Sequence, residues 1–343
     1  MMYEISEAKD YYVFIEQRKN KIMDVSLELI GEACKLKEKT PGYQVVGILL
    51  GHNVSGLAHE AIAYGCDKVI VVDNPRLETF IPEPYTKAMS AVVQEFKPDG
   101  LLVGASTIGR DLGPRVAARC KTGLTADATI LEVDPENPES KLLWFTRPAF
   151  GGNLFGTIIC PNHRPQMATV RPGVMVKNAK DANRKGEIIN FPVDITDADI
   201  NVTLGKFVEK IVEGVDISDA DIIVAGGRGV GSKEGFELLE KVAKQLGGEV
   251  AGSRAAIDAG WLKKNKQVGQ TGKTVRPQVY IACGISGAVQ HTAGMDGSEY
   301  IIAINKDKGA PIFDVAHTAI VGDLFEVLPK LADDLQAAKE AKK

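Results

Sequence analysis

The chain has 343 residues, of which 44% are hydrophobic and 25% charged, so it can bury a large core and is long enough for two domains. Its 41 basic and 45 acidic side chains alternate along helical stretches and give a formal net charge of -4, which argues against a nucleic-acid-binding surface. The cysteines stand singly, without the spacing of a metal site, at Cys34, Cys66, Cys120, Cys160 and Cys283.

The N-terminus carries no recognisable targeting signal. It has acidic residues early, and it lacks both the basic and apolar regions of a secretory signal and the Arg-rich character of a transit peptide. No segment approaches the roughly 20 consecutive apolar residues that span a bilayer. We therefore expect a cytoplasmic protein without a membrane span.

Short apolar runs alternate with amphipathic stretches over the first third of the chain. Strands are expected at 11–17, 43–51, 67–73 and 99–106, with helices at 21–39, 55–65, 84–96 and 110–120. This rhythm is typical of a parallel sheet with helices on both faces. Strand-like pieces without helices between them follow, and we expect them to complete or flank this sheet: 126–133, 142–149, 153–160 and 166–174.

The second half of the chain repeats this alternation after a polar interval. Residues 178–206 are rich in Asp and Asn and lack helical periodicity, so we interpret them as a linker that ends a first domain at about 205. The series from residue 221 onward predicts a five-stranded, doubly wound domain over 207–330, with a helical tail at 331–343. The predicted fold class is α/β with two doubly wound domains.

Two glycine-containing segments of the second domain are ambiguous when taken alone. Gly226, Gly227, Gly229 and Gly231 lie between a strand and a helix, where backbone N–H groups can face a phosphate, but a structural turn fits equally well. The segment 269–274 ends like a P-loop but lacks its first glycine. It is either a polar loop or a loop whose hydroxyl and amide groups meet a ring edge such as that of an isoalloxazine.

A third segment, 283–291, follows another predicted strand and is expected to begin a helix near Ser286. Its small residues allow close approach of a ligand, and His291 lies one turn into the expected helix. The alternative is that His291 is a structural histidine. A hydrolase is disfavoured, because Ser286 lacks the G-x-S-x-G frame and has no assignable acid partner.

Five segments of the second domain, taken together and in order, resemble the alpha subunit of electron-transfer flavoproteins: 225–229, 252–256, 267–272, 284–291, and 303–307 with 310–313. In the first domain the best match is 147–153. The resemblance implies an adenine-nucleotide-hydrolase-like, Rossmann-type N-terminal domain that packs on a beta subunit without its own FAD. It implies a C-terminal domain that binds FAD.

The resemblance also implies which residues hold the cofactor. It places Arg254 against the isoalloxazine ring, Thr271 near N5, and His291 near N1 and the C2 carbonyl, where these residues tune the redox chemistry. A positive or donating His291 beside Arg254 stabilises negative charge that gathers on the reduced ring. The other implied contacts are Arg228, Ser253, Gln270, Gly272, Ser286, Gly287, Ala288, Gln290, Asn305 and Asp323.

By the same resemblance the chain carries single electrons between a beta subunit and an acyl-CoA or related dehydrogenase, and converts no substrate itself. A housekeeping type has AMP in the beta subunit, whereas a bifurcating type from anaerobes has a second FAD there and oxidises NADH. The N-terminal part looks closer to the second type. Alternatives are a nucleotide-binding regulatory module and an NAD-dependent dehydrogenase, the latter disfavoured because no G-x-G-x-x-G with a following acid appears.

Overall fold

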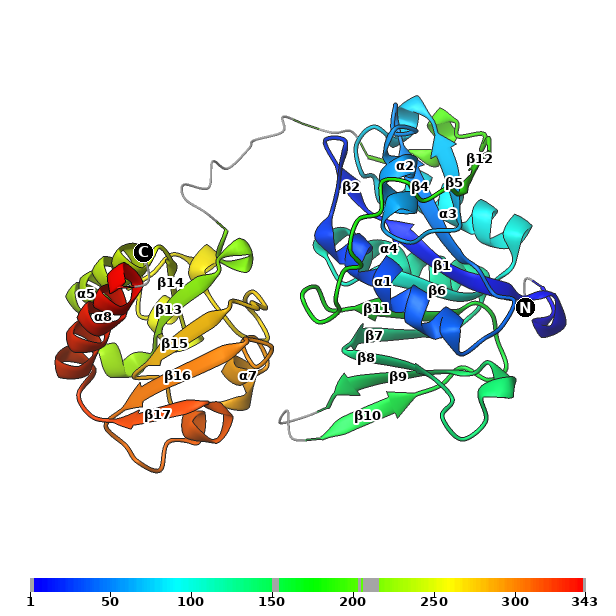
Figure 1. Cartoon of the computed structure of the whole chain (residues 1–343). Coiled ribbons are helices and arrows are strands. Elements are labelled where there is room, and N and C mark those ends of the chain that lie inside the picture. Colours follow the sequence, from blue (N-terminus) through cyan, green and yellow to red (C-terminus); the bar gives the residue numbers. More distant parts are fainter. Residues whose placement is uncertain (1–2, 150–153, 203–204, 206–215, 342–343) are drawn as a thin grey trace. The chain divides into compact units, whose positions relative to one another are not determined.

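The computed structural model describes residues 3–149, 154–202, 205 and 216–341 (Figure 1). They form two compact units, the N-terminal unit within 1–208 and the C-terminal unit within 209–343. The predicted domain boundary at about 206, and part of the segment 147–153, fall outside the described residues. No helix within the described ranges is long and apolar enough to cross a membrane.

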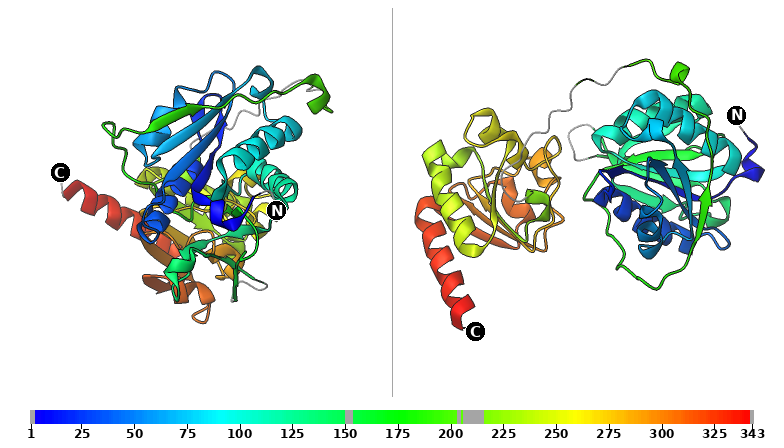
Figure 2. Two further views of the ribbon diagram at one scale, coloured as in Figure 1. Left: turned by 90° about the vertical axis from the view of Figure 1, so that its right-hand side faces the viewer. Right: turned by 90° about the horizontal axis from the view of Figure 1, so that it is seen from above.

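A parallel sheet forms the middle layer of the N-terminal unit. Its strands, in spatial order, are β12 (Glu187–Asn190), β5 (Lys68–Asp73), β4 (Val45–Gly51), β1 (Lys9–Ile15), β6 (Pro98–Gly104), β11 (Gln166–Val170) and β7 (Leu124–Ala128). Helices α1 (Asp24–Glu38) and α2 (Leu57–Ala63) cover one face, and α3 (Pro82–Phe96) and α4 (Thr107–Cys120) cover the other (Figure 2). Strands buried on both faces explain the continuous apolar runs.

The strand-like pieces after α4 divide between two sheets. β7 and β11 join the parallel sheet, as expected. β8 (Ile130–Val133), β9 (Leu143–Pro148) and β10 (Phe155–Ile158) form a separate antiparallel sheet in the order β10-β9-β8. A hairpin of β2 (Gln17–Arg18) and β3 (Lys21–Ile22) follows β1.

The predicted linker is wrong over part of its length, because it contains β12. This edge strand pairs with β5, from Glu187 opposite Lys68 to Asn190 opposite Val71. Asn74 further anchors the segment by donating to the carbonyl of Val193 at 3.2 Å. A four-residue strand carries too few apolar residues for its period to stand out against polar neighbours.

A second parallel sheet forms the centre of the C-terminal unit. Its strands, in spatial order, are β14 (Glu249–Gly252), β13 (Ile222–Gly226), β15 (Val279–Cys283), β16 (Tyr300–Asn305) and β17 (Thr318–Val321). The long helices α5 (Lys233–Leu246) and α8 (Leu324–Ala341) pack on one face, and loops containing Val268, Met295 and Ile312 cover the other. The predicted α/β fold class with two doubly wound units is confirmed.

Two helix predictions in this unit need correction. The C-terminal helix is no separate tail from 331, because α8 begins at Leu324 and buries Leu328 and Ala332 in the core beside α5. The helix expected near Ser286 is only α7 (Val289–Thr292), because Gly287 has a φ of +91°, outside the helical region. The other short helix of this unit is α6 (Arg254–Asp258).

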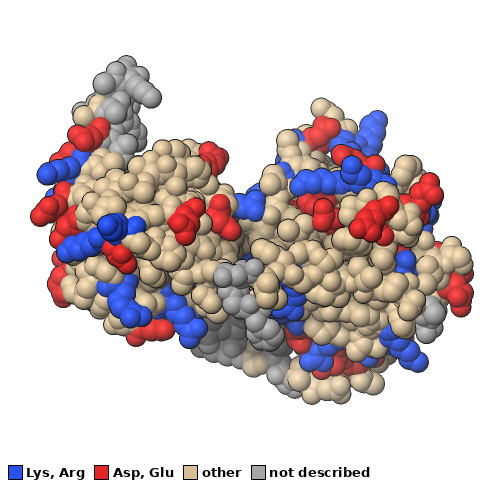
Figure 3. Space-filling model, turned by 90° about the horizontal axis from the view of Figure 1, so that it is seen from below, with Lys and Arg blue, Asp and Glu red and all other residues tan. Residues whose placement is uncertain are grey.

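Short 3-10 helices lie in the connections, at Ile5–Glu7, Pro75–Leu77, Pro138–Ser140, Asp197–Asp199, Ile217–Asp219, Arg228–Val230, Lys264–Lys266 and Pro311–Val315. On the face of the chain in Figure 3, acidic and basic side chains are intermingled. Exposed ion pairs such as Arg115 with Asp111, at 2.8 Å, contribute roughly 0–1 kcal/mol each. The stability of both units therefore comes mainly from their buried apolar layers.

Candidate cofactor-binding site

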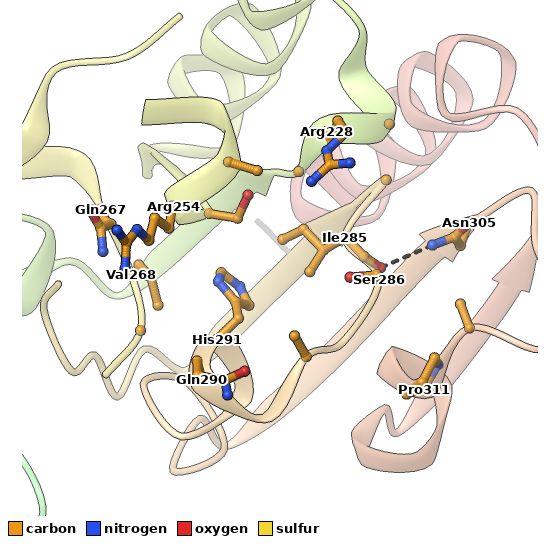
Figure 4. A pocket seen from close by; sticks show the side chains of 18 of the residues that line it. Arg228, Arg254, Gln267, Val268, Ile285, Ser286, Gln290, His291, Asn305 and Pro311 are labelled. Carbon is orange, nitrogen blue, oxygen red and sulfur yellow. Dashed lines mark hydrogen bonds between the residues drawn. The ribbon is translucent and has the colours of Figure 1, made fainter. Parts of the chain in front are cut away.

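A pocket of about 990 Å³ opens in the C-terminal unit, at the point in the parallel sheet from which successive strands are added in opposite directions (Figure 4). β13 and β15 are neighbours, but the chain continues from β13 to β14 on one side and from β15 to β16 on the other. Parallel sheets bind ligands outside the carboxyl ends of strands at such a point. The pocket lies among the loops that follow β13, β14, β15 and β16.

Most of the predicted binding residues line this pocket: Arg228, Ser253, Arg254, Thr271, Ser286, Ala288, Gln290, His291 and Asn305. Figure 4 shows Arg254 and Gln267 toward one end and Asn305 and Pro311 toward the other, with His291 between them. The groups of the pocket are thus spread along a line. An extended ligand with chemically different ends suits this arrangement.

The other predicted residues have structural partners instead. Gly287 lets two loops approach closely, because a Cβ there would lie 2.0 Å from the backbone nitrogen of Ile312. Asp323 accepts from the backbone N–H of Phe325 at 3.0 Å and pairs with Lys306 at 2.9 Å, at the start of α8. Neither residue lies in the pocket wall.

Gln270 and Gly272 shape the loop between the 3-10 helix Lys264–Lys266 and β15. The backbone N–H of Gln270 donates to the carbonyl of Gln290 at 2.7 Å, and that of Gly272 donates to Gly269 at 2.9 Å. Both lie outside the set of pocket-lining residues. Their contacts hold neighbouring pocket residues in place.

The glycine-rich turn after β13 packs one loop against another. Gly227 donates through its N–H to the carbonyl of Cys283 at 2.9 Å, and Gly229 donates to that of Gly284 at 3.0 Å. A Cβ on Gly227 would lie 2.3 Å from the carbonyl oxygen of Gly284. These N–H groups, which the sequence left open as phosphate donors, therefore serve the structural turn.

Two arginines bring positive charge to the pocket. Arg228 is exposed, and its guanidinium makes no ion pair with any described residue. Arg254 pairs with Asp258 at 3.3 Å, and both side chains are more than half exposed. Since an exposed pair contributes roughly 0–1 kcal/mol, Arg254 can exchange Asp258 for an anionic or aromatic ligand.

His291 is buried in the middle of the pocket wall, with 6% of its surface exposed. Its Nε2 lies 3.0 Å from the hydroxyl of Tyr280, and its buried Nδ1 has no hydrogen-bond partner among the described residues. Burial lowers the pKa of His291 to about 4, an effect that the nearby backbone of Val268, which makes no hydrogen bond of ordinary geometry with the ring, only partly offsets. The imidazole of the cofactor-free chain is therefore neutral at pH 7, which favours a donating His291 over a positive one, the two states that the resemblance left open.

Tyr280 decides which nitrogen of His291 carries the proton. Burial raises the pKa of the Tyr280 phenol well above its ordinary value, so the phenol keeps its proton. If Nε2 donated to Tyr280, the phenol proton would be left without an acceptor among the described residues, at a cost of roughly 1–3 kcal/mol. The favoured arrangement has Tyr280 donating to Nε2, which leaves Nδ1–H as a donor for a ligand.

Several pocket residues were not assigned to the site from the sequence, among them Asp258, Gln267, Val268, Ile285 and Asp307. Asp258 had a detectable signal, because an acid four residues after an arginine on a helix forms an ion pair with it. Val268 and Ile285 are apolar wall residues. Nothing in their residue type distinguishes them from core residues.

Comparison with known proteins agrees with this division of the chain. The family model described as electron transfer flavoprotein domain matches residues 12–196, and that described as electron transfer flavoprotein FAD-binding domain matches 216–296.

Similar proteins include the electron transfer flavoprotein subunit alpha of Thermoanaerobacterium thermosaccharolyticum, 51% identical over 98% of this chain and 100% of that protein. The same subunit of Megasphaera elsdenii is 51% identical over 98% of this chain and 99% of its own length. The acryloyl-CoA reductase electron transfer subunit beta of Anaerotignum propionicum is 46% identical over 98% of both chains. The chain therefore belongs to the electron transfer flavoprotein family, as an alpha subunit with a FAD-binding domain.

Proposed function

We propose that the pocket of the C-terminal unit holds FAD, and that the chain passes single electrons between a beta subunit and an acyl-CoA-type dehydrogenase. One observation carries the proposal: two exposed arginines and a buried, unpartnered imidazole nitrogen meet in one pocket at the switch point of the sheet. FAD has a diphosphate that arginine binds and a ring edge rich in acceptors. The donor set of the pocket therefore fits this cofactor.

Different residues of the pocket would bind different parts of FAD. Arg228 is free to hold the diphosphate, and Arg254 lies away from it, toward the end of the pocket where the ring is expected. FAD supplies the one-electron chemistry when bound. His291 donates from Nδ1 to a ring acceptor, and this hydrogen bond strengthens as negative charge builds up on that acceptor. Val268 and Ile285 keep water from this contact.

The beta subunit covers the edge of the small antiparallel sheet. At this edge Leu154 is 67% exposed and Phe155 is 62% exposed, and Ile158 and Ile159 are also exposed. An edge strand with neighbouring exposed apolar side chains is a typical interaction surface. This surface belongs to the N-terminal unit, which the resemblance implies packs on the beta subunit.

Besides the beta subunit, the protein that exchanges electrons with this FAD is a CoA-ester dehydrogenase or reductase. A relative that is 46% identical is named as the electron transfer subunit of acryloyl-CoA reductase, which supports this class of partner. The finer proposal is electron bifurcation, in which the beta subunit carries a second FAD and oxidises NADH.

The number of FAD molecules per purified heterodimer tests both levels of the proposal. One FAD, lost when this pocket is blocked, supports a simple carrier, and two support the bifurcating type. A heterodimer that releases only an adenine nucleotide on denaturation contradicts the proposal and favours a regulatory nucleotide-binding module.

A further inference from the structure

Gln267 is a buried amide in the wall of the pocket, with 1% of its surface exposed. It precedes the loop that carries Thr271, and its backbone carbonyl accepts from the N–H of Lys273 at 2.8 Å, which closes that loop. The side chain of Gln267 lies at one end of the pocket in Figure 4. Both the backbone and the side chain of this residue are thus fixed.

The surrounding groups determine the orientation of the Gln267 amide. The ammonium group of Lys264 lies 2.6 Å from Oε1, and an ammonium group can only donate. The carbonyl oxygen of the amide must therefore face Lys264. The NH₂ group faces the other way and donates to Oγ1 of Thr271 at 2.9 Å.

This orientation fixes the polarity of Thr271. Its oxygen is used as an acceptor by Gln267, and its own proton has no acceptor among the described residues. Thr271 is exposed in the pocket wall, so this proton can point at a ligand. The chain from Lys264 through Gln267 leaves the pocket with a second donor besides His291.

We propose that Gln267 is a positioning residue that holds the Thr271 hydroxyl as a hydrogen-bond donor toward an acceptor atom on the bound FAD ring. The inference rests on the proposed function, since it requires FAD in this pocket. It assigns to Gln267 and Lys264 a role through Thr271, without contact with the reacting atoms. The alternative is that Gln267 only closes the loop through its backbone.

Gln267→Glu separates these roles because it preserves the shape of the side chain and reverses its hydrogen bond. One carboxylate oxygen keeps Lys264, while the other can only accept, so the Thr271 hydroxyl turns to donate to it and presents lone pairs to the cofactor. We expect FAD to bind roughly 10-fold more weakly to the assembled heterodimer, since a donor is lost and two acceptors face each other. Thr271→Val should cost a similar factor.

The double variant Gln267→Glu, Thr271→Val should lose no more FAD affinity than either single variant, because both substitutions act through the same hydroxyl. Asn265→Asp is the charge-matched control: it adds the same charge in the same segment, lies outside the pocket wall and should bind FAD normally. Lys264→Met, which lets the side-chain amide of Gln267 flip, should give a smaller loss of FAD affinity. These variants keep the inference testable if Gln267→Glu folds poorly.

FAD labelled with ¹⁵N in the ring gives a readout independent of turnover. In the refilled heterodimer, one ring nitrogen or the nitrogen beside one ring carbonyl should change its chemical shift in Gln267→Glu and Thr271→Val alike. Unchanged shifts and affinity in Gln267→Glu, or an equal loss in Asn265→Asp, overturn the inference. Failure of the wild-type pocket to bind FAD overturns the proposed function instead.

Discussion

The two parallel sheets of this chain share a layout but use their switch points differently. In the N-terminal unit the reversal lies between β1 and β6, and Glu16, which directly follows β1, is only 1% exposed. Its carboxylate accepts from the hydroxyl of Ser106 and from Arg18 at 2.9 Å. In the C-terminal unit the equivalent place is the candidate FAD pocket.

The difference follows from the residues just after the strands. A carboxylate and the serine that caps α4 join the loops after β1 and β6. In the C-terminal unit, small residues follow β13, β14 and β15 and leave room for the pocket between the loops. The exposed arginines of these loops supply positive charge and have no buried acidic partner. The same sheet architecture therefore gives a self-contained unit in one case and a binding unit in the other.

The largest effect is expected from Glu16→Ala, which removes the carboxylate that joins the two N-terminal loops. Loss of this buried acceptor should lower the free energy of unfolding of the N-terminal unit by roughly 2–3 kcal/mol. Denaturant unfolding measures it, with Glu38→Ala, an exposed residue of α1, as the near-neutral control. The affinity for FAD should stay unchanged. If Glu16→Ala also weakened FAD binding, the claim that only the C-terminal switch point serves the cofactor would be contradicted.

Arg228→Gln should have the opposite profile. FAD binding should weaken about 10- to 100-fold, because a charge-assisted contact contributes roughly 1.5–3 kcal/mol. The free energy of unfolding of the cofactor-free protein should hardly change, since Arg228 has no ion pair among the described residues. Isothermal titration with FAD measures the affinity, and Arg119→Gln, which removes an exposed charge from the N-terminal unit, should bind as wild type.

The neutral state of His291 makes the cofactor-free C-terminal unit sensitive to acid. The pKa of His291 is about 4 in the folded chain and about 6.5 when unfolded, so the unfolded state binds the extra proton between these values. Stability is complete above about pH 6.5 and falls as the pH drops toward 4, by roughly 1–2 kcal/mol between pH 7 and 5. The slope should be absent in His291→Gln. A slope that persists there assigns the effect to other groups.

His291→Ala should lower the potential for the first electron by roughly 20–60 mV, because a neutral hydrogen bond contributes roughly 0.5–1.5 kcal/mol and about 1.4 kcal/mol corresponds to 59 mV. A charged histidine would have given more. Spectroelectrochemical titration at full FAD occupancy measures the shift, with His59→Ala in the N-terminal unit as control. A shift well above 100 mV would contradict the neutral state.

Much of this could be predicted from the sequence, because it depends on local pattern. Apolar runs bounded by glycine revealed the strands of both sheets, and polar or small residues after those strands revealed most of the pocket wall. The edge strand β12 escaped because only Ile188 and Ile189 mark it in a polar stretch. Its pairing with β5 depends on the tertiary structure.

The electrostatics of the site could not be predicted, because they depend on contacts between distant segments. The neutral state of His291 follows from burial beside Tyr280 on another element and beside the loop that carries Val268. The polarity of Thr271 depends on how Lys264 orients Gln267. The glycine turn at 227–229 stayed open between a phosphate site and a structural turn, because the carbonyls of Cys283 and Gly284 that accept from its N–H groups belong to a distant segment.

Hydrogen exchange of the cofactor-free heterodimer, measured with and without added FAD, tests the contrast between the two switch points most directly. The account predicts that FAD protects backbone amides in the loops after β13, β14, β15 and β16, and leaves those after β1 and β6 unchanged. Protection confined to the loops after β1 and β6, with none in the C-terminal unit, would contradict it.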